Sequence, residues 1–226
     1  RAHDPKVAAE YEQRGRIVGT LATQATVSVC DAWFADNVDG LDSVIVVETE
    51  AAAAALSGRC QELLRVGDRL GERVADACGD GNPLHLGDMI QTRRNTRELA
   101  TSDRTRVLNR DVWRITGRSA NGEIQAVSLT RRATVTLTRE YVTADVVLAY
   151  ATTIAGAQGR TTDTGHVVVT PRTSSAAVYV GMTRGRRRNT AHVITDGHDH
   201  AELDLGDRTA TQAFADAITR TGDGQR

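Results

Sequence analysis

Residues 149–163 read AYATTIAGAQGRTTD, an apolar run that ends in two threonines and leads to Gln158, Gly159 and an arginine. One interpretation is a turn from a strand into a helix, in which a threonine caps the next element and Gly159 adopts a positive φ. Another is a loop that binds a phosphate or nucleic acid at the carboxyl end of a parallel strand. These residues alone leave both interpretations open.

The composition is that of an ordinary globular protein, with 226 residues, 40% apolar and 25% charged. A net charge of −1 gives no argument for nucleic acid. The three cysteines, Cys30, Cys60 and Cys78, are odd in number and widely spaced, which favours a reducing cytosol over a disulfide framework. We find neither a signal peptide nor an apolar run of the ~20 residues that span a membrane. We therefore expect a cytoplasmic protein with no membrane partner, and the absence of an initiating Met suggests a piece of a longer chain.

The first region, residues 1–81, predicts one strand and one helix. The continuous β-branched run DSVIVVET (42–49) is typical of a fully buried strand. Thr49 can cap a helix over residues 50–65, and Gly67 would end that helix. Cys60 is then a small core residue, and the apolar face of the helix would contain Ala52, Leu56, Leu63 and Leu64.

The second region, residues 82–142, predicts a small antiparallel β-barrel. Four short alternating segments, HLGDMIQTRRN, VLNRDVWRITG, GEIQAVSLTRR and ATVTLTREYV, are separated by Gly, Asn and Asp turns. Trp113 could stack on a base, but a core position is the more common role of a tryptophan in so small a barrel. Trp33 is likewise expected in the core. Five arginines cluster around the first loop, either as a solvated polar surface or as a rim that contacts phosphates: Arg93, Arg94, Arg97, Arg104 and Arg106.

The third region, residues 143–226, returns to α/β character. Three buried strands are expected, at DVVLAYATT (145–153), GHVVVT (165–170) and AHVIT (191–195). Ser174 or Ser175 can cap a helix that packs Ala177, Val178 and Met182 inward and ends near Arg184. A closing amphipathic helix would bury Ala210, Phe214, Ala217 and Ile218. The barrel thus interrupts one α/β domain.

Two motifs in this order carry a family resemblance. YATTIAGAQGRTTD (150–163) and AVYVGMTRGRRRN (177–189) resemble the last two conserved motifs of superfamily-one DNA helicases of the RecD-like branch. GDMIQTRRN…VLNRDVWRITG resembles the barrel inserted in their second motor domain. The wording is nearest to the helicase half of TraA/TrwC-type (MobF) conjugative relaxases, particularly actinobacterial ones, and the resemblance covers nearly the whole chain.

The resemblance implies an α/β fold. It is a RecA-like (P-loop NTPase-type) second motor domain with a parallel sheet, formed by residues 1–81 and 143–226. A small SH3-like antiparallel barrel, residues 82–142, interrupts it. Such motors bind ATP and Mg²⁺ between two RecA-like domains and move along single-stranded DNA.

The resemblance also assigns roles to individual residues. Arg184 in MTRG matches the arginine finger, whose forked guanidinium suits a phosphate. Gln158 and Gly159 match the motif that couples the nucleotide cleft to the DNA track. The remaining assignments are Thr183 and Arg59 toward the nucleotide, Arg59 through a loose match to the fourth motif, and Thr153, Arg93 and Arg94 toward DNA.

Two departures from the family pattern bear on function. Ala155 stands where family members often have a histidine that points toward DNA. The phosphate loop G-x-x-x-x-G-K-[ST] is missing, since the sole lysine, Lys6, follows Pro5 with no glycine loop before it. The resemblance then implies half of a catalytic site, inactive alone, with most Mg²⁺ ligands in an upstream P-loop domain and a relaxase domain in the same protein. The alternative is a non-catalytic nucleic-acid-binding module or a decayed helicase remnant.

Other chemistries have weaker signals. His198 and His200 flank an aspartate, but two histidines on a loop are more typical of a solvated turn than of a metal site, so no metal ligands are assigned. No G-x-S-x-G elbow supports a serine hydrolase.

Overall fold

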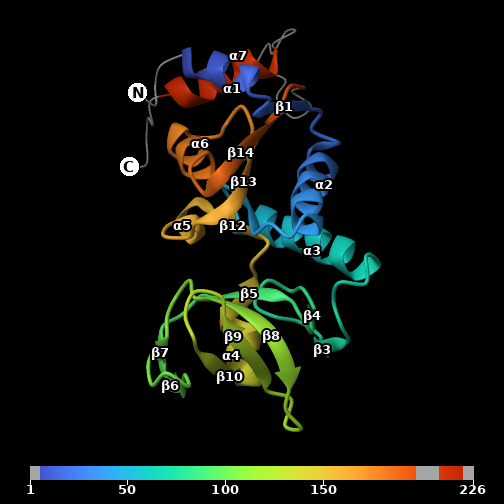
Figure 1. Ribbon diagram of the computed structural model, residues 1–226, viewed down its shortest axis with the longest axis vertical. Helices are drawn as coiled ribbons and strands as arrows, with labels where there is room; N and C mark the ends of the chain where they lie inside the picture. The colour runs from blue at the N-terminus through green and yellow to red at the C-terminus, as the bar shows by residue number, and fades with distance from the viewer. Residues whose placement is uncertain (1–5, 197–208, 221–226) are drawn as a thin grey trace. The chain divides into compact units, whose positions relative to one another are not determined.

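The computed structural model describes residues 6–196 and 209–220 (Figure 1). The chain forms two compact units. One contains the described residues up to Ala53 and from Thr152 onward, and the other contains Ala54–Ala151. The chain therefore leaves the first unit after Ala53 and returns to it at Thr152.

The first unit is built on a five-stranded sheet of order β1-β14-β13-β2-β12. The pairings of β1 with β14, of β14 with β13 and of β13 with β2 are all parallel. This confirms the predicted α/β class with a parallel sheet. The strands are β1 (Ile17–Thr20), β2 (Ser43–Val47), β12 (Ala151–Thr153), β13 (Thr162–Val169) and β14 (Gly185–Ile194).

Helices pack against this sheet, as Figure 1 shows for α2 and α6. The predicted closing helix is α7, which begins with a capping box between Thr209 and Gln212 and buries Phe214 and Ile218 beside Val167. Ser174 caps α6 by accepting a hydrogen bond from the Ala177 amide, as expected. The helices are α1 (Lys6–Gln13), α2 (Ala25–Val38), α5 (Ile154–Ala157), α6 (Ser175–Gly181) and α7 (Ala210–Thr219), with α3 (Glu50–Val66) beginning in this unit.

Strand β2 and helix α3 confirm the prediction for residues 42–65. Every residue of β2 is buried, and Thr49 Oγ1 accepts a hydrogen bond from the Ala52 amide at 3.1 Å. The end of α3 differs in one detail. Asp68, not Gly67, has the left-handed conformation, with φ 53°. Aspartate is among the few non-glycine residues that tolerate this conformation.

The second unit is antiparallel, as predicted for the segments between residues 82 and 142. Its main sheet has the order β10-β9-β8-β5-β11, and two further sheets pair β3 with β4 and β6 with β7. Trp113 on β8 is fully buried, so it is a core residue, as is Trp33 in the first unit. The elements are β3 (Arg73–Ala75), β4 (Leu84–His85), β5 (Met89–Thr92), β6 (Thr96–Ala100), β7 (Arg106–Val107), β8 (Val112–Arg118), β9 (Ile124–Ser128), β10 (Thr134–Leu137), α4 (Arg139–Asp145) and β11 (Val146–Leu148).

Three predicted strands are wrong in extent. The strand expected at 191–195 is β14, which already begins at Gly185. The run 145–153 is not one strand: β11 joins the antiparallel sheet, and β12 joins the parallel sheet. Tyr150 lies between them, with its hydroxyl donating to the buried Asp88 carboxylate at 2.6 Å. The segment ATVTLTREYV is a strand only to Leu137, because the Thr138 side chain accepts a hydrogen bond from the Tyr141 amide and starts α4.

Candidate functional site

The quoted stretch 149–163 forms a strand, a capped short helix and a turn. β12 ends at Thr153, whose Oγ1 accepts a hydrogen bond from the Gly156 amide at 3.2 Å and so caps α5. Gly159 has φ +81°, with open space where a Cβ would lie. The interpretation as a strand-to-helix turn is therefore correct. Thr153 is only 9% exposed, whereas Gln158 and Gly159 are exposed.

Arg184 joins this turn to the end of α6. Its Nη1 donates to the carbonyls of Ala157 and Arg160, each at 3.2 Å. Its Nε donates to Val180 O at 3.0 Å, and its Nη2 donates to Thr183 Oγ1 at 3.0 Å. We call this set of four bonds the Arg184 clamp. It brings together Gln158, Gly159, Thr183 and Arg184, four of the residues singled out in the sequence.

The clamp lies along one edge of the parallel sheet. Arg184 immediately precedes β14, and Thr162, the first residue of β13, pairs with Gly185, the first residue of β14. Asp42 precedes β2 and forms an ion pair with Arg160 at 3.5 Å. Since these strands are parallel, the residues before them share the amino-terminal edge of the sheet. Burial lowers the pKa of Arg160, and the nearby Asp42 acts in the opposite direction.

The arginines that follow Arg184 are paired with carboxylates. Arg186 and Arg187 lie 3.4 Å and 3.5 Å from the same Asp163 oxygen. Arg188 donates to Asp36 of α2. The first residues of β14 therefore carry exposed positive charges, each with a carboxylate partner. A phosphate would compete with these partners for the guanidinium groups.

Three of the predicted site residues lie in the second unit. Arg59 is exposed on α3. Arg94 forms an ion pair with Asp145 through Nε at 2.7 Å, and its guanidinium lies 5.5 Å from the centre of the Tyr141 ring. Arg93 is half-buried, with its backbone amide donating to Asp145 O at 2.7 Å. Arg94 is thus already held by an internal carboxylate and an aromatic ring.

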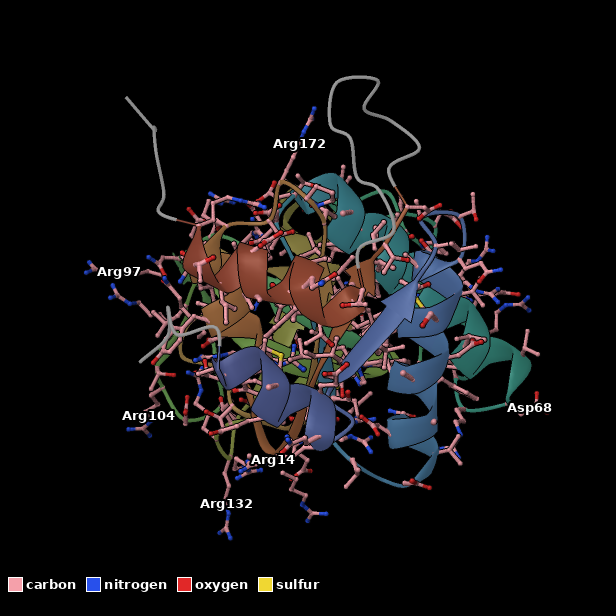
Figure 2. All side chains as sticks on the ribbon, turned by 90° about the horizontal axis from the view of Figure 1, so that it is seen from above. Arg14, Asp68, Arg97, Arg104, Arg132 and Arg172 are labelled. Carbon is pink, nitrogen blue, oxygen red and sulfur yellow. The ribbon has the colours of Figure 1, made fainter. Side chains whose placement is uncertain are left out.

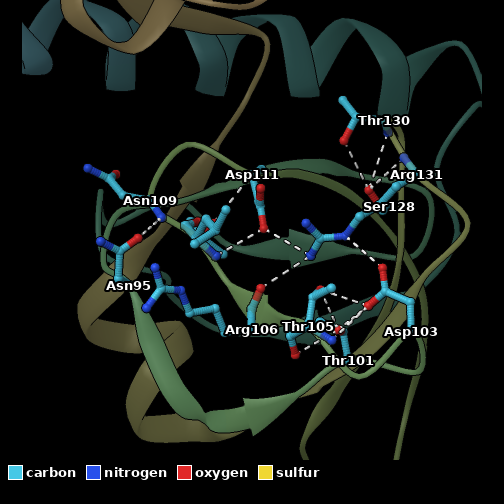
Figure 3. A network of polar contacts seen from close by, with 12 residues as sticks. Asn95, Thr101, Asp103, Thr105, Arg106, Asn109, Asp111, Ser128, Thr130 and Arg131 are labelled. Atoms are coloured by element: carbon cyan, nitrogen blue, oxygen red, sulfur yellow. Dashed lines mark hydrogen bonds and ion pairs between the residues drawn. The ribbon is translucent and has the colours of Figure 1, made fainter.

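The arginine-rich loop is fixed by a polar network (Figure 3). Arg131 contacts Asp103 at 3.4 Å and Asp111 at 3.2 Å, and donates to the Arg106 carbonyl. Hydrogen bonds from the hydroxyls of Thr101 and Thr105 lower the pKa of Asp103 to about 2. The loop backbone is therefore well anchored, while the side chains of Arg97 and Arg104 extend away from the ribbon (Figure 2).

A buried polar chain in the first unit was missed by the sequence analysis. Asp36 Oδ2 lies 3.0 Å from His166 Nε2, His166 Nδ1 lies 3.1 Å from His192 Nε2, and His192 Nδ1 lies 3.3 Å from Ser28 Oγ. Both histidines are 1% exposed. The signal was available, because each histidine interrupts an apolar strand run, in GHVVV and AHVIT.

The environment of this chain fixes its charge state. Burial acts to raise the pKa of Asp36, but the hydrogen bond from His166 and the charge of Arg188 outweigh burial and leave the pKa lowered. Burial, with the nearby His166, lowers the pKa of His192 to about 3. His192 is therefore neutral at physiological pH, and Asp36 is ionised.

The described residues, 6–196 and 209–220, contain neither a metal cluster nor a membrane-spanning helix. No cluster of three or more His, Cys, Asp or Glu side chains in that part of the chain is arranged to hold a metal ion. His198 and His200 lie outside the described residues. Within the same residues, no helix combines the length and the hydropathy needed to cross a membrane.

Comparison with known proteins gives structural neighbours alone. No family model matches the chain, and no curated protein matches it. A Pif1 helicase from Bacteroides, solved with ADP-AlF3 and single-stranded DNA, is 16% identical over 75% of this chain and 42% of that chain, with a TM-score of 0.45. Pif1 helicase from Candida albicans is 11% identical over 78% of this chain and 49% of that chain, with a TM-score of 0.42. This chain thus spans less than half of either helicase, and likenesses this distant assign no activity to it.

Proposed function

We propose that this chain is the C-terminal motor part of an ATP-dependent superfamily-one DNA helicase, from a conjugative relaxase of the TraA/TrwC type. Its first unit is then the RecA-like second motor domain, and residues 82–142 are the SH3-like insert. The partners are single-stranded DNA and an upstream P-loop domain of the same protein, in the cytoplasm. The observation that carries the proposal is the Arg184 clamp, which joins the two segments that resemble helicase motifs.

In this proposal Arg184 supplies the arginine finger. A guanidinium has five N–H donors, and the clamp uses four of them. The fifth can meet a phosphate oxygen at once, whereas a fuller contact requires Arg184 to exchange carbonyl partners for the phosphate. Such an exchange would link nucleotide binding to the Gln158–Gly159 turn. Thr183 is bonded to Arg184 and would follow its movement, and Arg59 would contribute to nucleotide binding as a separate contact.

The residues proposed to contact DNA differ in their exposure and in the partners that they already have. Thr153 caps α5 and is nearly buried, so its hydroxyl would act on DNA through the position of the turn. Arg93 and Arg94 lie beside the exposed arginine-rich loop, and a phosphate would have to replace Asp145 as the partner of Arg94. Because the 226 residues contain no phosphate loop, Mg²⁺ and most of the ATP contacts are assigned to the upstream domain.

The test uses the longer motor that includes the P-loop domain. Arg184→Ala should lower the kcat of ATP hydrolysis by ~10³-fold or more while the nucleotide Kd changes modestly, because a finger acts mainly in the transition state. Arg184→Lys should restore little of the lost kcat, since an ammonium lacks the planar fork of a guanidinium. Arg187→Ala, which removes a charge paired with Asp163, is the matched control and should retain near-normal turnover.

A purely structural role of the clamp gives a different result. Arg184→Ala would then lower the melting temperature and weaken nucleotide binding with little change in kcat. That outcome contradicts the finger and favours the second candidate, a non-catalytic nucleic-acid-binding module. The second candidate is supported by the four clamp bonds already made and by the missing phosphate loop. The 226-residue chain alone should show no ATP hydrolysis, and steady turnover abolished by Arg184→Ala would overturn the assignment of ATP binding to a missing domain.

A further inference from the structure

The second unit contains a pocket of about 370 Å³ that none of the predicted sites includes. Its lining comes from β3, from the ends of β8 and β9, and from α4. Three arginines surround it: Arg73, Arg118 and Arg139. Val74, Ile124 and Val142 lie beneath it in the core, and the apolar lining residues with exposed surface are Ala75 and Ala77. The volume lies within the ~300–1,000 Å³ of small-molecule sites, and near its lower end.

The charge of the lining is strongly positive. Asp76 is the one acidic residue among the lining residues, and its side chain is 98% exposed and 3.9 Å from Arg73. In the described part of the chain the side chains of Arg118 and Arg139 make no hydrogen bond or ion pair. This contrasts with Arg94, Arg131 and Arg188, which each hold a carboxylate. Two guanidinium groups with unused donors thus face one hollow.

Gly122 leaves room for the guanidinium of one of these arginines. It lies in the turn between β8 and β9 with φ +78°, and a Cβ there would overlap the Arg139 guanidinium. Glycine therefore serves two needs at once, the left-handed turn and the close approach of the Arg139 fork. The pocket has a shaped wall as well as a positive charge.

We propose that this pocket binds a nucleoside phosphate, either free or as one nucleotide unit of a single strand. Forked guanidinium donors from Arg118 and Arg139 would hold the phosphate oxygens, with Arg73 adding charge at the rim. The accessible apolar surface of Ala75 and Ala77 would contact the sugar or the base. The proposal is independent of the motor function, since it requires neither ATP hydrolysis nor Arg184.

The test measures binding by the 226-residue chain to two probes, thymidine 5′-monophosphate and a 5′-fluorescein-labelled dT12 oligonucleotide. Calorimetry serves the first probe and fluorescence anisotropy the second. Arg118→Gln and Arg139→Gln should each weaken binding by about tenfold or more, the effect expected for losing a charged hydrogen-bonding partner. Arg132→Gln makes the same charge change at an exposed arginine of the same unit outside the pocket and is the matched control (Figure 2). All three positions are exposed, so melting temperatures should match and exclude unfolding as the cause.

The two probes separate the sources of the phosphate. If Arg118→Gln and Arg139→Gln weaken the binding of both probes more than Arg132→Gln does, the pocket accepts free nucleotides. If they weaken only the binding of dT12, the pocket is a subsite for a nucleic-acid strand. If Arg118→Gln and Arg139→Gln weaken neither probe more than Arg132→Gln does, the proposal is wrong. Loss of ATPase activity on Arg184→Ala in the longer motor has no bearing on this result, so the two proposals can fail separately.

Discussion

At the scale of single residues, Asp88 is a buried carboxylate of the second unit with three hydrogen-bond donors. It is fully buried and accepts hydrogen bonds from Tyr150 Oη at 2.6 Å, from Gln61 Nε2 at 2.7 Å and from the His85 amide at 2.7 Å. Burial raises its pKa to about 6, and the Tyr150 bond acts in the opposite direction. Because the folded pKa lies above the unfolded value of about 3.9, ionisation of Asp88 reduces stability as the pH rises from about 4 to 6.

Tyr150→Phe should destabilise the protein by about 1–3 kcal/mol at pH 8, since it leaves an ionised buried carboxylate short of a donor. The loss should be smaller at pH 5, where Asp88 is largely protonated. Urea unfolding at both pH values measures it. Tyr179→Phe is the control, because that ring is 59% exposed. An equal loss for Tyr150→Phe at the two pH values would contradict the role given to the Asp88 charge.

This pair also shows the limit of prediction at the residue scale. Tyr150 was assigned to a strand from its apolar neighbours, and nothing near it in sequence indicates that Asp88, 62 residues earlier, accepts a hydrogen bond from its hydroxyl. Thr49, Thr153 and Ser174 were predictable as caps, because a cap bonds to an amide only two or three residues away. Hydrogen-bond partners a few residues apart can therefore be predicted from the sequence nearby, whereas partners that meet only in the folded protein cannot.

At the scale of elements, a row of hydrogen-bonded side chains connects α2 to β13 and β14. It consists of Ser28, His192, His166 and Asp36. His192 has a folded pKa of about 3, below its ordinary 6.5, so the unfolded chain binds a proton there between these values and the folded chain does not. The stability that depends on neutral His192 is therefore present above about pH 6.5 and is lost as the pH falls toward 3. The groups that face this ring are His166 and Ser28, with Asp36 and Arg188 beyond them.

His192→Gln should remove this dependence. The variant should be less stable at pH 7.5, because a buried ring and its hydrogen bonds are lost, by roughly 1–3 kcal/mol. When the pH falls from 7.5 to 5, the free energy of unfolding of the variant should then decrease by about 2 kcal/mol less than that of the original protein. Urea unfolding at the two pH values gives the difference, to which Asp88 contributes equally in both proteins. Parallel losses would show that His192 is protonated in the folded state.

The elements themselves were predicted well where the apolar pattern was strong. β2, β13, α7 and the second half of β14 follow from continuous or periodic apolar runs, whereas the polar first half of β14 was not predicted. The split of residues 145–153 between two sheets was not predictable, because a buried run looks the same whichever sheet takes it up. The missed boundary therefore lies where the chain passes from one unit to the other.

At the scale of the whole molecule, a net charge of −1 means that any affinity for DNA must come from local arginine clusters. Binding to single strands should be indifferent to sequence and should fall steeply with salt, with a slope of about −0.7 in log–log form for each phosphate contacted. Arg93→Gln combined with Arg94→Gln, which removes two such contacts, should reduce the magnitude of that slope by about 1.4. Fluorescence anisotropy of a labelled oligonucleotide across a salt series measures it.

Arg14→Gln is the control for this DNA prediction, since Arg14 is exposed and lies in the other unit (Figure 2). An unchanged slope in the double variant would show that Arg93 and Arg94 do not contact DNA phosphates and belong to a solvated surface. The sequence predicted the α/β class and the antiparallel insertion because both depend on the order of apolar patterns along the chain. It did not predict the pocket lined by Arg73, Arg118 and Arg139, whose lining residues lie up to 70 positions apart and meet only after folding.

The Arg184 clamp has a dynamic consequence. The carbonyls of Ala157 and Arg160 and the end of α6 share one guanidinium, so neither segment can open without breaking bonds of the other. The amides of Arg160 and Met182, which close the two turns, should therefore exchange with deuterium at matched rates, as parts of one cooperative unit. Arg184→Ala should leave two independent turns with different exchange rates. A single side chain would then determine whether two segments more than twenty residues apart fluctuate as one body.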